Sequence, residues 1–177
     1  MLRFLRLQNW KSYYEPVEFT MVATRERRHG DRLARVGRSR ILPITAVYGA
    51  NAAGKSTLVD GLEALSGIVL ESRRAGAMLP VAPHLPEGRD EPTAFAVEIV
   101  VSAVGADDDA VDRVFYYELA ADRRRIHREL LAQVKARTEE LLFARDEDGV
   151  ALYGELDGDE RARAHAMVVA PNETLLG

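Results

Sequence analysis

Hydrophobic and polar residues interleave at strand spacing in several parts of the chain. Near the N-terminus, residues 2–7 and 17–22 show this pattern on either side of a short polar link, which predicts an antiparallel pair. The pattern returns in residues 93–104 and 111–121, and the acidic stretch between them predicts a hairpin with a polar tip. These runs predict two pairs of antiparallel strands.

Residues 41–71 follow a different order, which predicts a strand, a turn and a helix. Residues 41–48 are apolar and partly β-branched and predict a buried strand, whereas residues 56–70 carry leucine and valine at helical spacing. The turn between them contains Gly49, Ala50, Asn51, Ala52, Ala53, Gly54, Lys55, Ser56 and Thr57. It matches the pattern G-x-x-x-x-G-K-[ST] at every fixed position.

This turn has the chemistry of a phosphate site. The first turn of a helix leaves N–H groups without intrahelical partners, and phosphate oxygens can accept from them. Gly49 and Gly54 permit backbone angles and a close approach that a Cβ would hinder. Lys55 supplies a charge for the β- and γ-phosphates, and the Ser56 hydroxyl is placed to ligate Mg²⁺. The flanking predicted strand and helix disfavour a chance match, so we predict a nucleotide site.

The predicted organisation has six parts. They are lead-in strands in 1–24, an arginine-rich loop in 25–40, the strand–turn–helix unit in 41–71, a loop in 72–92, an antiparallel region in 93–154 and a tail in 155–177. Proline and glycine in 72–92 predict a surface excursion. The arginine-rich loop has two open interpretations, a contact with nucleic-acid or nucleotide phosphates and a solvated connector, and the lack of interleaved aromatic residues favours the connector.

Two assignments in the C-terminal half depend on weaker patterns. Residues 123–145 fit either a helix or further strands, and we favour strands. Glu118 ends an apolar run that superficially resembles a Walker B strand, but its place in a predicted hairpin favours an edge-strand glutamate. Residues 160–166 begin either a helix or an irregular crossover.

Composition narrows the class of protein. The 177 residues suffice for one domain, and their apolar and charged fractions are those of an ordinary globule. The net formal charge of −4 argues against a globally basic nucleic-acid binder but leaves room for a local basic patch. Cysteine is absent, which suits the cytosol, and no stretch has the length of a membrane span. We therefore predict a cytoplasmic protein without a membrane partner.

The lead-in Leu7-x-Asn9-Trp10-Lys11-Ser12-Tyr13, followed by a P-loop that contains Asn51 and ends Gly-Lys-Ser-Thr, resembles the ATPase heads of the ABC, SMC and RecF group. It is most similar to AAA-family ATP-binding proteins of abortive-infection and overcoming-lysogenization type. The resemblance implies an α/β fold, namely a P-loop NTPase lobe of ABC/SMC-head type with an antiparallel β-subdomain, incomplete at its C-terminal side. It also implies ATP and Mg²⁺ as cofactors, with Lys55 catalytic.

The resemblance also assigns roles within the lead-in. Lys11 and Ser12 are expected near the nucleotide phosphates, although a solvated turn lysine is an equal alternative for Lys11. Trp10 is expected to be a packing anchor rather than an adenine-stacking ring. Many relatives carry glycine where this chain has Ala52, and alanine would be strained there if the position needed a positive φ.

The resemblance covers only the N-terminal half of a complete head, because no signature motif, Walker B strand or switch histidine follows. We therefore expect either a truncated product or one half of a split enzyme, partnered by a second ATPase head or by a C-terminal half. The implied function is ATP binding in nucleic-acid-linked phage defence or DNA repair, with hydrolysis weak or absent in the isolated chain. A non-hydrolysing nucleotide-binding interaction module is the alternative. A P-loop kinase or GTPase is a third possibility, and the lack of an Asn-Lys pair counts against GTP.

Overall fold

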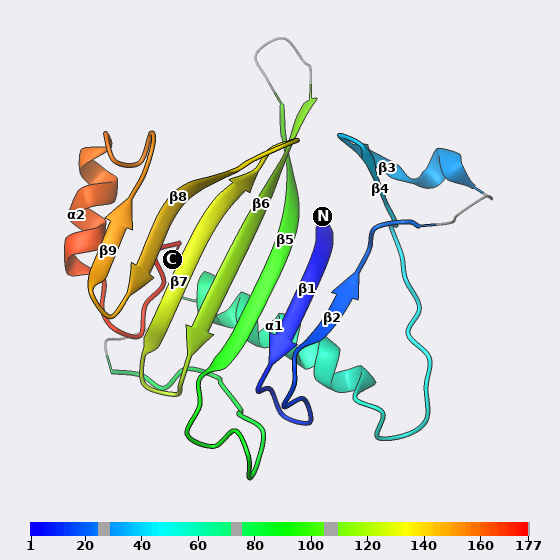
Figure 1. The fold of residues 1–177 in the computed structure, drawn as a ribbon, viewed down its shortest axis with the longest axis horizontal. Helices are drawn as coiled ribbons and strands as arrows, with labels where there is room; N and C mark the ends of the chain where they lie inside the picture. Colours follow the sequence, from blue (N-terminus) through cyan, green and yellow to red (C-terminus); the bar gives the residue numbers. More distant parts are fainter. Residues whose placement is uncertain (25–28, 72–75, 105–109, 177) are drawn as a thin grey trace.

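The computed structural model describes residues 1–24, 29–71, 76–104 and 110–176, and most of them form one antiparallel sheet (Figure 1). Its seven strands lie in the order β2-β1-β5-β6-β7-β8-β9. Their bounds are β1 Leu2–Gln8, β2 Val17–Thr20, β5 Thr93–Val104, β6 Ala110–Ala121, β7 Ile126–Val134, β8 Glu139–Asp146 and β9 Gly149–Leu152. A separate two-stranded hairpin pairs β3 (Ala34–Val36) with β4 (Ser39–Ile41) and follows a short 3₁₀ helix, Gly30–Arg32.

The strand pairing confirms the alternation in the sequence. β5 and β6 pair from Thr93 opposite Ala121 to Val104 opposite Ala110, which is the predicted hairpin. β1 pairs antiparallel with β2, as expected for the lead-in, and its other edge pairs with β5. The ambiguous region 123–145 contains strands β7 and β8 with a turn between them rather than a helix, which confirms the strands that the sequence favoured.

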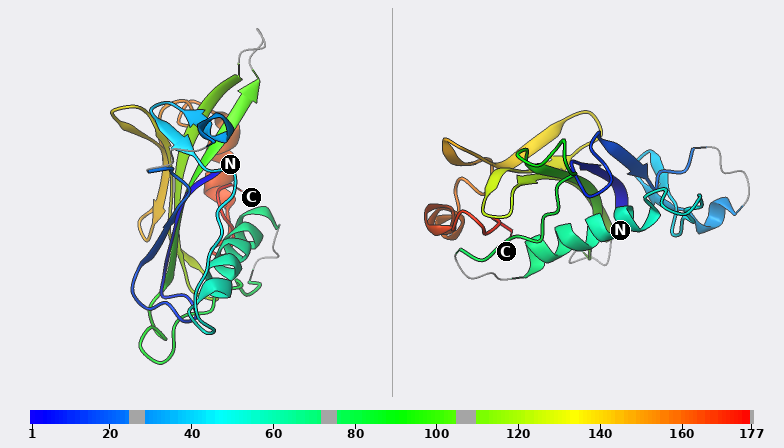
Figure 2. Two further views of the ribbon diagram at one scale, coloured as in Figure 1. Left: turned by 90° about the vertical axis from the view of Figure 1, so that its right-hand side faces the viewer. Right: turned by 90° about the horizontal axis from the view of Figure 1, so that it is seen from below.

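The core lies between the sheet and the long helix α1 (Lys55–Leu70), which crosses one face of the sheet (Figure 2). Leu65 and Ile68 of α1 are buried in one cluster with Leu7 of β1. A Cβ added to Gly61 would lie 2.5 Å from the Leu7 Cδ1 atom, so glycine is what lets the helix approach β1 this closely. Trp10 is 2% exposed with its ring centroid 5.5 Å from that of Phe95, which confirms the packing anchor.

The predicted α/β fold class is wrong. The seven-stranded sheet is antiparallel throughout, and the described residues contain only two α-helices, α1 and α2 (Glu160–Val168). They contain no parallel sheet flanked by helices, which a P-loop NTPase lobe of ABC/SMC-head type requires.

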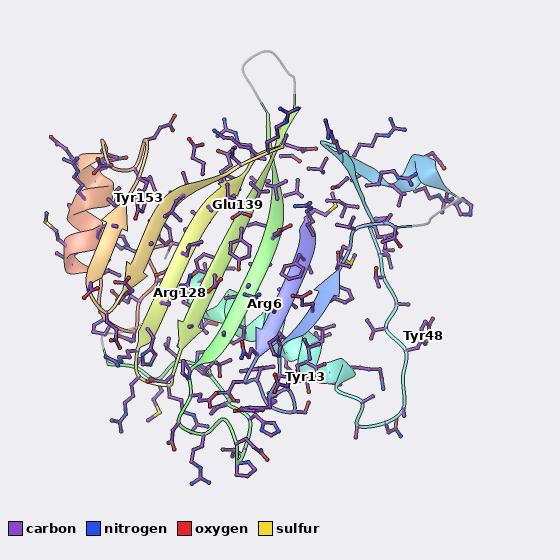
Figure 3. All side chains as sticks on the ribbon, in the orientation of Figure 1. Arg6, Tyr13, Tyr48, Arg128, Glu139 and Tyr153 are labelled. Carbon is purple, nitrogen blue, oxygen red and sulfur yellow. The ribbon has the colours of Figure 1, made fainter. Side chains whose placement is uncertain are left out.

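The predicted strand 41–48 accounts for much of this error. Only Ile41 belongs to a strand, and residues 42–48 pair with no other strand of the described chain. Ile44 is 82% exposed and Tyr48 is 89% exposed, and Figure 3 shows Tyr48 on a trace that runs outside the sheet. An apolar run predicts a buried strand only if a neighbouring strand supplies hydrogen bonds, and the pattern itself does not reveal that neighbour.

Two smaller predictions also need correction. Glu118 lies in β6, between β5 and β7, so it is a central-strand rather than an edge-strand glutamate. The arginine-rich region is not wholly a loop, because its residues 30–41 form the 3₁₀ helix and the β3–β4 hairpin; residues 25–28 lie outside the described part. Neither α-helix in the described part of the chain has the length and apolar character that a membrane crossing requires.

Candidate phosphate-binding turn

The turn before α1 ends in an open helix N-terminus. Gly54 is the N-cap residue with φ 86°, and Ala52 also has a positive φ, 64°. No side chain of the described residues caps α1, whereas the Asp159 carboxylate caps α2 by accepting from the Arg161 and Ala162 amides. The first-turn N–H groups of α1 therefore have no side-chain acceptor and are available to an anion.

Lys55 is held at this turn by the turn's own carbonyl groups. Its Nζ donates to Gly49 O at 2.9 Å and to Ala50 O at 2.7 Å. No carboxylate of the described residues forms an ion pair with it. The structure thus brings together the two predicted ends of the motif and keeps the lysine charge without a counter-ion beside the helix N-terminus.

The lead-in turn between β1 and β2 packs against the same end of α1. Ser12 Oγ lies 3.1 Å from Thr57 Oγ1, and the Trp10 indole donates to Thr57 O at 3.0 Å. The Tyr13 hydroxyl donates to Gly54 O at 2.7 Å. These contacts join the lead-in turn to the first turn of the helix and place Ser12 beside Thr57. The role of Ser12 at nucleotide phosphates stays a prediction.

Lys11 is directed differently from Ser12. Its Nζ lies 2.5 Å from the Asp60 Oδ2 atom on α1 and 5.3 Å from the Trp10 ring centroid. The amine is therefore part of an ion pair on the helix rather than a second unpaired charge at the turn. Asn51 and Ser56 are both exposed.

Tyr13 is a residue of this site that sequence reasoning did not predict. A Cβ added at Gly54 would lie 2.7 Å from Tyr13 Cε1 and 2.8 Å from its hydroxyl, so the ring covers the glycine closely. The only signal in the sequence is the position of Tyr13 directly after Ser12 in the lead-in. The partner glycine is 41 residues away, and no local pattern connects the two.

A cleft of about 870 Å³ lies beside the lead-in turn but is a separate feature. Its lining includes Lys11, Arg89, Asp122, Arg123 and His127, and none of residues 49–57 contributes to it. The His127 Nε2 and Asp122 Oδ2 atoms are 2.8 Å apart, so two of its polar groups pair with each other. The cleft is not the phosphate site that the sequence predicts.

Fold and site together define an antiparallel β-sheet protein backed by one long helix, with a turn that matches the pattern G-x-x-x-x-G-K-[ST] at the start of that helix. No family model, no curated protein and no solved structure matches the chain. No group of three or more histidine, cysteine or acidic residues placed to hold a metal ion occurs within 1–24, 29–71, 76–104 and 110–176.

Proposed function

We propose that residues 49–57 bind the phosphate chain of ATP, with Mg²⁺ on the Ser56 hydroxyl. The observation that carries this proposal is the uncapped N-terminus of α1 with the Lys55 amine held beside it. Backbone N–H groups at a helix start and a nearby cation are the two components that polyphosphate recognition needs.

The Lys55 amine has hydrogen-bond acceptors in the free protein and can bind phosphate oxygens when nucleotide is present. Its present acceptors, Gly49 O and Ala50 O, are neutral carbonyls. A phosphate oxygen carries negative charge, so it adds a Coulombic attraction to the ammonium group that a neutral carbonyl lacks, and phosphate competes effectively for the amine. We therefore expect the lysine to exchange one or both carbonyls for the bound phosphate.

Ser56 is suited to a magnesium ion that arrives with the nucleotide. Mg²⁺ usually keeps several waters and takes its remaining ligands from one or two protein oxygens and the substrate phosphates. The exposed Ser56 hydroxyl at the helix start offers one such oxygen. The Ser12 to Thr57 contact supports the neighbouring residue and limits movement of this turn.

The second candidate function is nucleotide-dependent association without hydrolysis. Hydrolysis needs a group that positions the attacking water. Asp60 pairs with Lys11, and the Glu118 carboxylate accepts from the Tyr116 hydroxyl at 2.6 Å and pairs with Arg128 at 3.3 Å. The sequence also lacks the aspartate–glutamate pair of a Walker B strand, so we expect this chain to bind ATP with little or no turnover. A role in phage defence or DNA repair stays a prediction from the resemblance.

The test is a thermal shift with MgATP. At a hundredfold excess over Kd, ligand binding stabilises the folded state by about 2.7 kcal/mol, which for a chain of this size raises Tm by roughly 5–10 °C. We expect Lys55→Ala to lose most of this shift, and MgAMP to give little shift with the unchanged protein.

Lys135→Ala is the matched control, because Lys135 pairs with Glu140 at the far end of β7 and also loses one positive charge. It should keep the full shift. An equal shift in Lys55→Ala and Lys135→Ala, or no shift with the unchanged protein, would contradict the proposal.

A further inference from the structure

The β3–β4 unit carries exposed arginines that the rest of the structure does not neutralise. We call residues 30–41 the arginine hairpin; its arginines are Arg32, Arg35, Arg38 and Arg40. All four are exposed, and no carboxylate of the described residues pairs with any of them. By contrast, Arg3, Arg6 and Arg128 on the large sheet each pair with a glutamate.

Strand alternation explains which way these arginines face. Val36 and Ile41 are buried in a cluster with Val100 of β5. Arg35 precedes Val36 on β3 and Arg40 precedes Ile41 on β4, so strand alternation turns both arginines outward. Arg35 and Arg40 are direct partners in the register. Like charges directly opposite each other destabilise a strand pair, so this arrangement costs stability unless an anion lies between them.

Backbone hydrogen bonds join the hairpin to the rest of the fold, so its arginines project from an anchored backbone. Ala23 N donates to Arg40 O at 2.8 Å, and Leu42 N donates to Met21 O at 2.8 Å, which joins the hairpin to the segment after β2. Gly37 has φ 57°, as a tight two-residue hairpin turn requires at its first central position.

We propose that the arginine hairpin binds the phosphate backbone of duplex nucleic acid without reading its sequence. Duplex DNA carries one negative charge per about 1.7 Å of its axis, and a protein without base contacts binds it through such charges alone. Residues 24–41 hold seven arginines against two acidic residues, in a chain whose net formal charge is −4, so positive charge is concentrated in this region.

The hairpin's surface favours a duplex over other anionic partners. Its large apolar side chains, Leu33, Val36 and Ile41, are all at most 8% exposed, so it offers no apolar anchor to a bilayer or to a protein interface. Residues 29–41 contain no phenylalanine, tyrosine or tryptophan that could stack on unpaired bases. Binding to a regular duplex phosphate backbone requires neither an exposed apolar anchor nor aromatic stacking on bases.

This inference does not rest on nucleotide binding at residues 49–57. The β3–β4 unit lies at the upper right of the molecule in Figure 1, and the start of α1 lies at the lower right, joined by the extended trace of residues 42–50. Loss of one activity in the tests would therefore leave the other measurable.

The experiment measures fluorescence anisotropy of a labelled DNA duplex of about 20 base pairs between 50 and 200 mM salt. Each neutralised phosphate contributes about −0.9 to the slope of log K against log salt. If the four arginines each neutralise one phosphate, the slope is about −3.6 and affinity falls roughly a hundredfold over this range. A duplex of scrambled sequence should bind equally.

Arg35→Gln/Arg40→Gln should weaken binding at least tenfold at 50 mM salt and reduce the slope by about 1.8. Arg35→Lys/Arg40→Lys should retain binding, because it keeps both charges. Arg161→Gln/Arg163→Gln removes the same charge from exposed positions on α2 and should leave binding close to that of the unchanged protein. Melting temperatures of all variants verify that each is folded.

Several outcomes would overturn the proposal. These are no binding of the unchanged protein at 50 mM salt, an equal loss in the α2 control, or an unchanged slope in Arg35→Gln/Arg40→Gln. Tighter binding to single-stranded DNA, to phosphatidylserine vesicles or to polyglutamate than to the duplex would also overturn it, and would identify the preferred class of anion.

Discussion

At the scale of single residues, Asn9 organises the loop before β5. It is 1% exposed and adopts φ 51° at the end of β1. Its Nδ2 donates to Gly88 O and Glu91 O, both at 2.8 Å, and its Oδ1 accepts from His84 N at 2.9 Å. One amide thus satisfies several backbone groups of a loop that is about eighty residues away in sequence.

We predict that Asn9→Asp destabilises the fold by about 3 kcal/mol. The substitution keeps size and tolerance of positive φ, but it puts an acceptor opposite two carbonyl oxygens and buries a carboxyl group without its donors. Urea unfolding measures the loss. Gln8→Glu makes the same chemical change at the exposed neighbour and should stay within about 0.5 kcal/mol of the unchanged protein; similar losses in both variants would refute the role of Asn9.

The role of a residue was predictable only where its own residue type and nearby sequence indicated it. The size and apolar character of Trp10 predicted its burial against Phe95, and the structure confirms it. The Asn9 amide and the Tyr13 hydroxyl act on loops 41 or more residues away. Such contacts depend on how the chain folds back on itself, which side-chain periodicity does not encode.

At the scale of elements, the turn before α1 contains a conformation that alanine adopts poorly. Ala52 has φ 64°, in the left-handed region where a Cβ costs about 1–2 kcal/mol. We predict that Ala52→Gly raises the free energy of unfolding by about 1 kcal/mol, because relief of strain exceeds the extra entropy of unfolded glycine.

Ala53→Gly is the control for this substitution, because Ala53 is not among the positive-φ residues. Ala53→Gly relieves no strain and only increases the conformational entropy of the unfolded chain. The free energy of unfolding should therefore fall by about 0.5–1 kcal/mol. Equilibrium unfolding in urea of both variants decides the matter. A loss of stability in Ala52→Gly would show that the turn does not hold the left-handed conformation in solution.

Strands were predicted correctly where hydrophobic and polar residues alternate and the partner strand lies nearby in the sequence. The β5–β6 hairpin and the β1–β2 pair meet that condition. The predicted strand at 41–48 failed because its apolar side chains match a buried strand while no described strand pairs with residues 42–48. The composition of the arginine hairpin predicts a loop, because its many arginines obscure the two inward positions Val36 and Ile41.

At the scale of the whole molecule, the face of the sheet turned away from α1 carries paired charges. Arg6 of β1 and Arg128 of β7 reach toward Glu118 of β6, and both arginines are labelled on this open face in Figure 3. Arg3 pairs with Glu98 at 2.6 Å on the same sheet. These three arginines of the sheet each have a carboxylate partner, whereas no carboxylate of the described residues pairs with the four arginines of the arginine hairpin.

The C-terminal segment is tied to the sheet through one buried carboxyl group. Glu129 of β7 is 0% exposed, and its oxygens accept from the Tyr117 hydroxyl at 2.9 Å and from Leu175 N at 3.0 and 3.1 Å. Arg145 lies 3.9 Å away and also donates to Glu173 O at 2.7 Å. The ionisation of Glu129 therefore bears on the stability of the whole chain.

Burial raises the pKa of Glu129 from 4.5 to about 7, against the lowering effect of its hydrogen bonds and of Arg145. Between pH 4.5 and 7 the folded state consequently binds more protons at this site than the unfolded state does, so the free energy of unfolding falls as pH rises through that window. The full effect, roughly 3 kcal/mol, is reached above pH 7.

Glu129→Gln abolishes this titration. We therefore predict that the unchanged protein loses roughly 3 kcal/mol relative to Glu129→Gln when the pH is raised from 4.5 to 8, measured by urea unfolding at several pH values. Glu139→Gln, at an exposed position on β8, should follow the unchanged protein across the range. Parallel stability curves for Glu129→Gln and the unchanged protein would mean that the buried carboxyl group does not titrate in this window, and that the C-terminal segment is held without a proton-linked contribution.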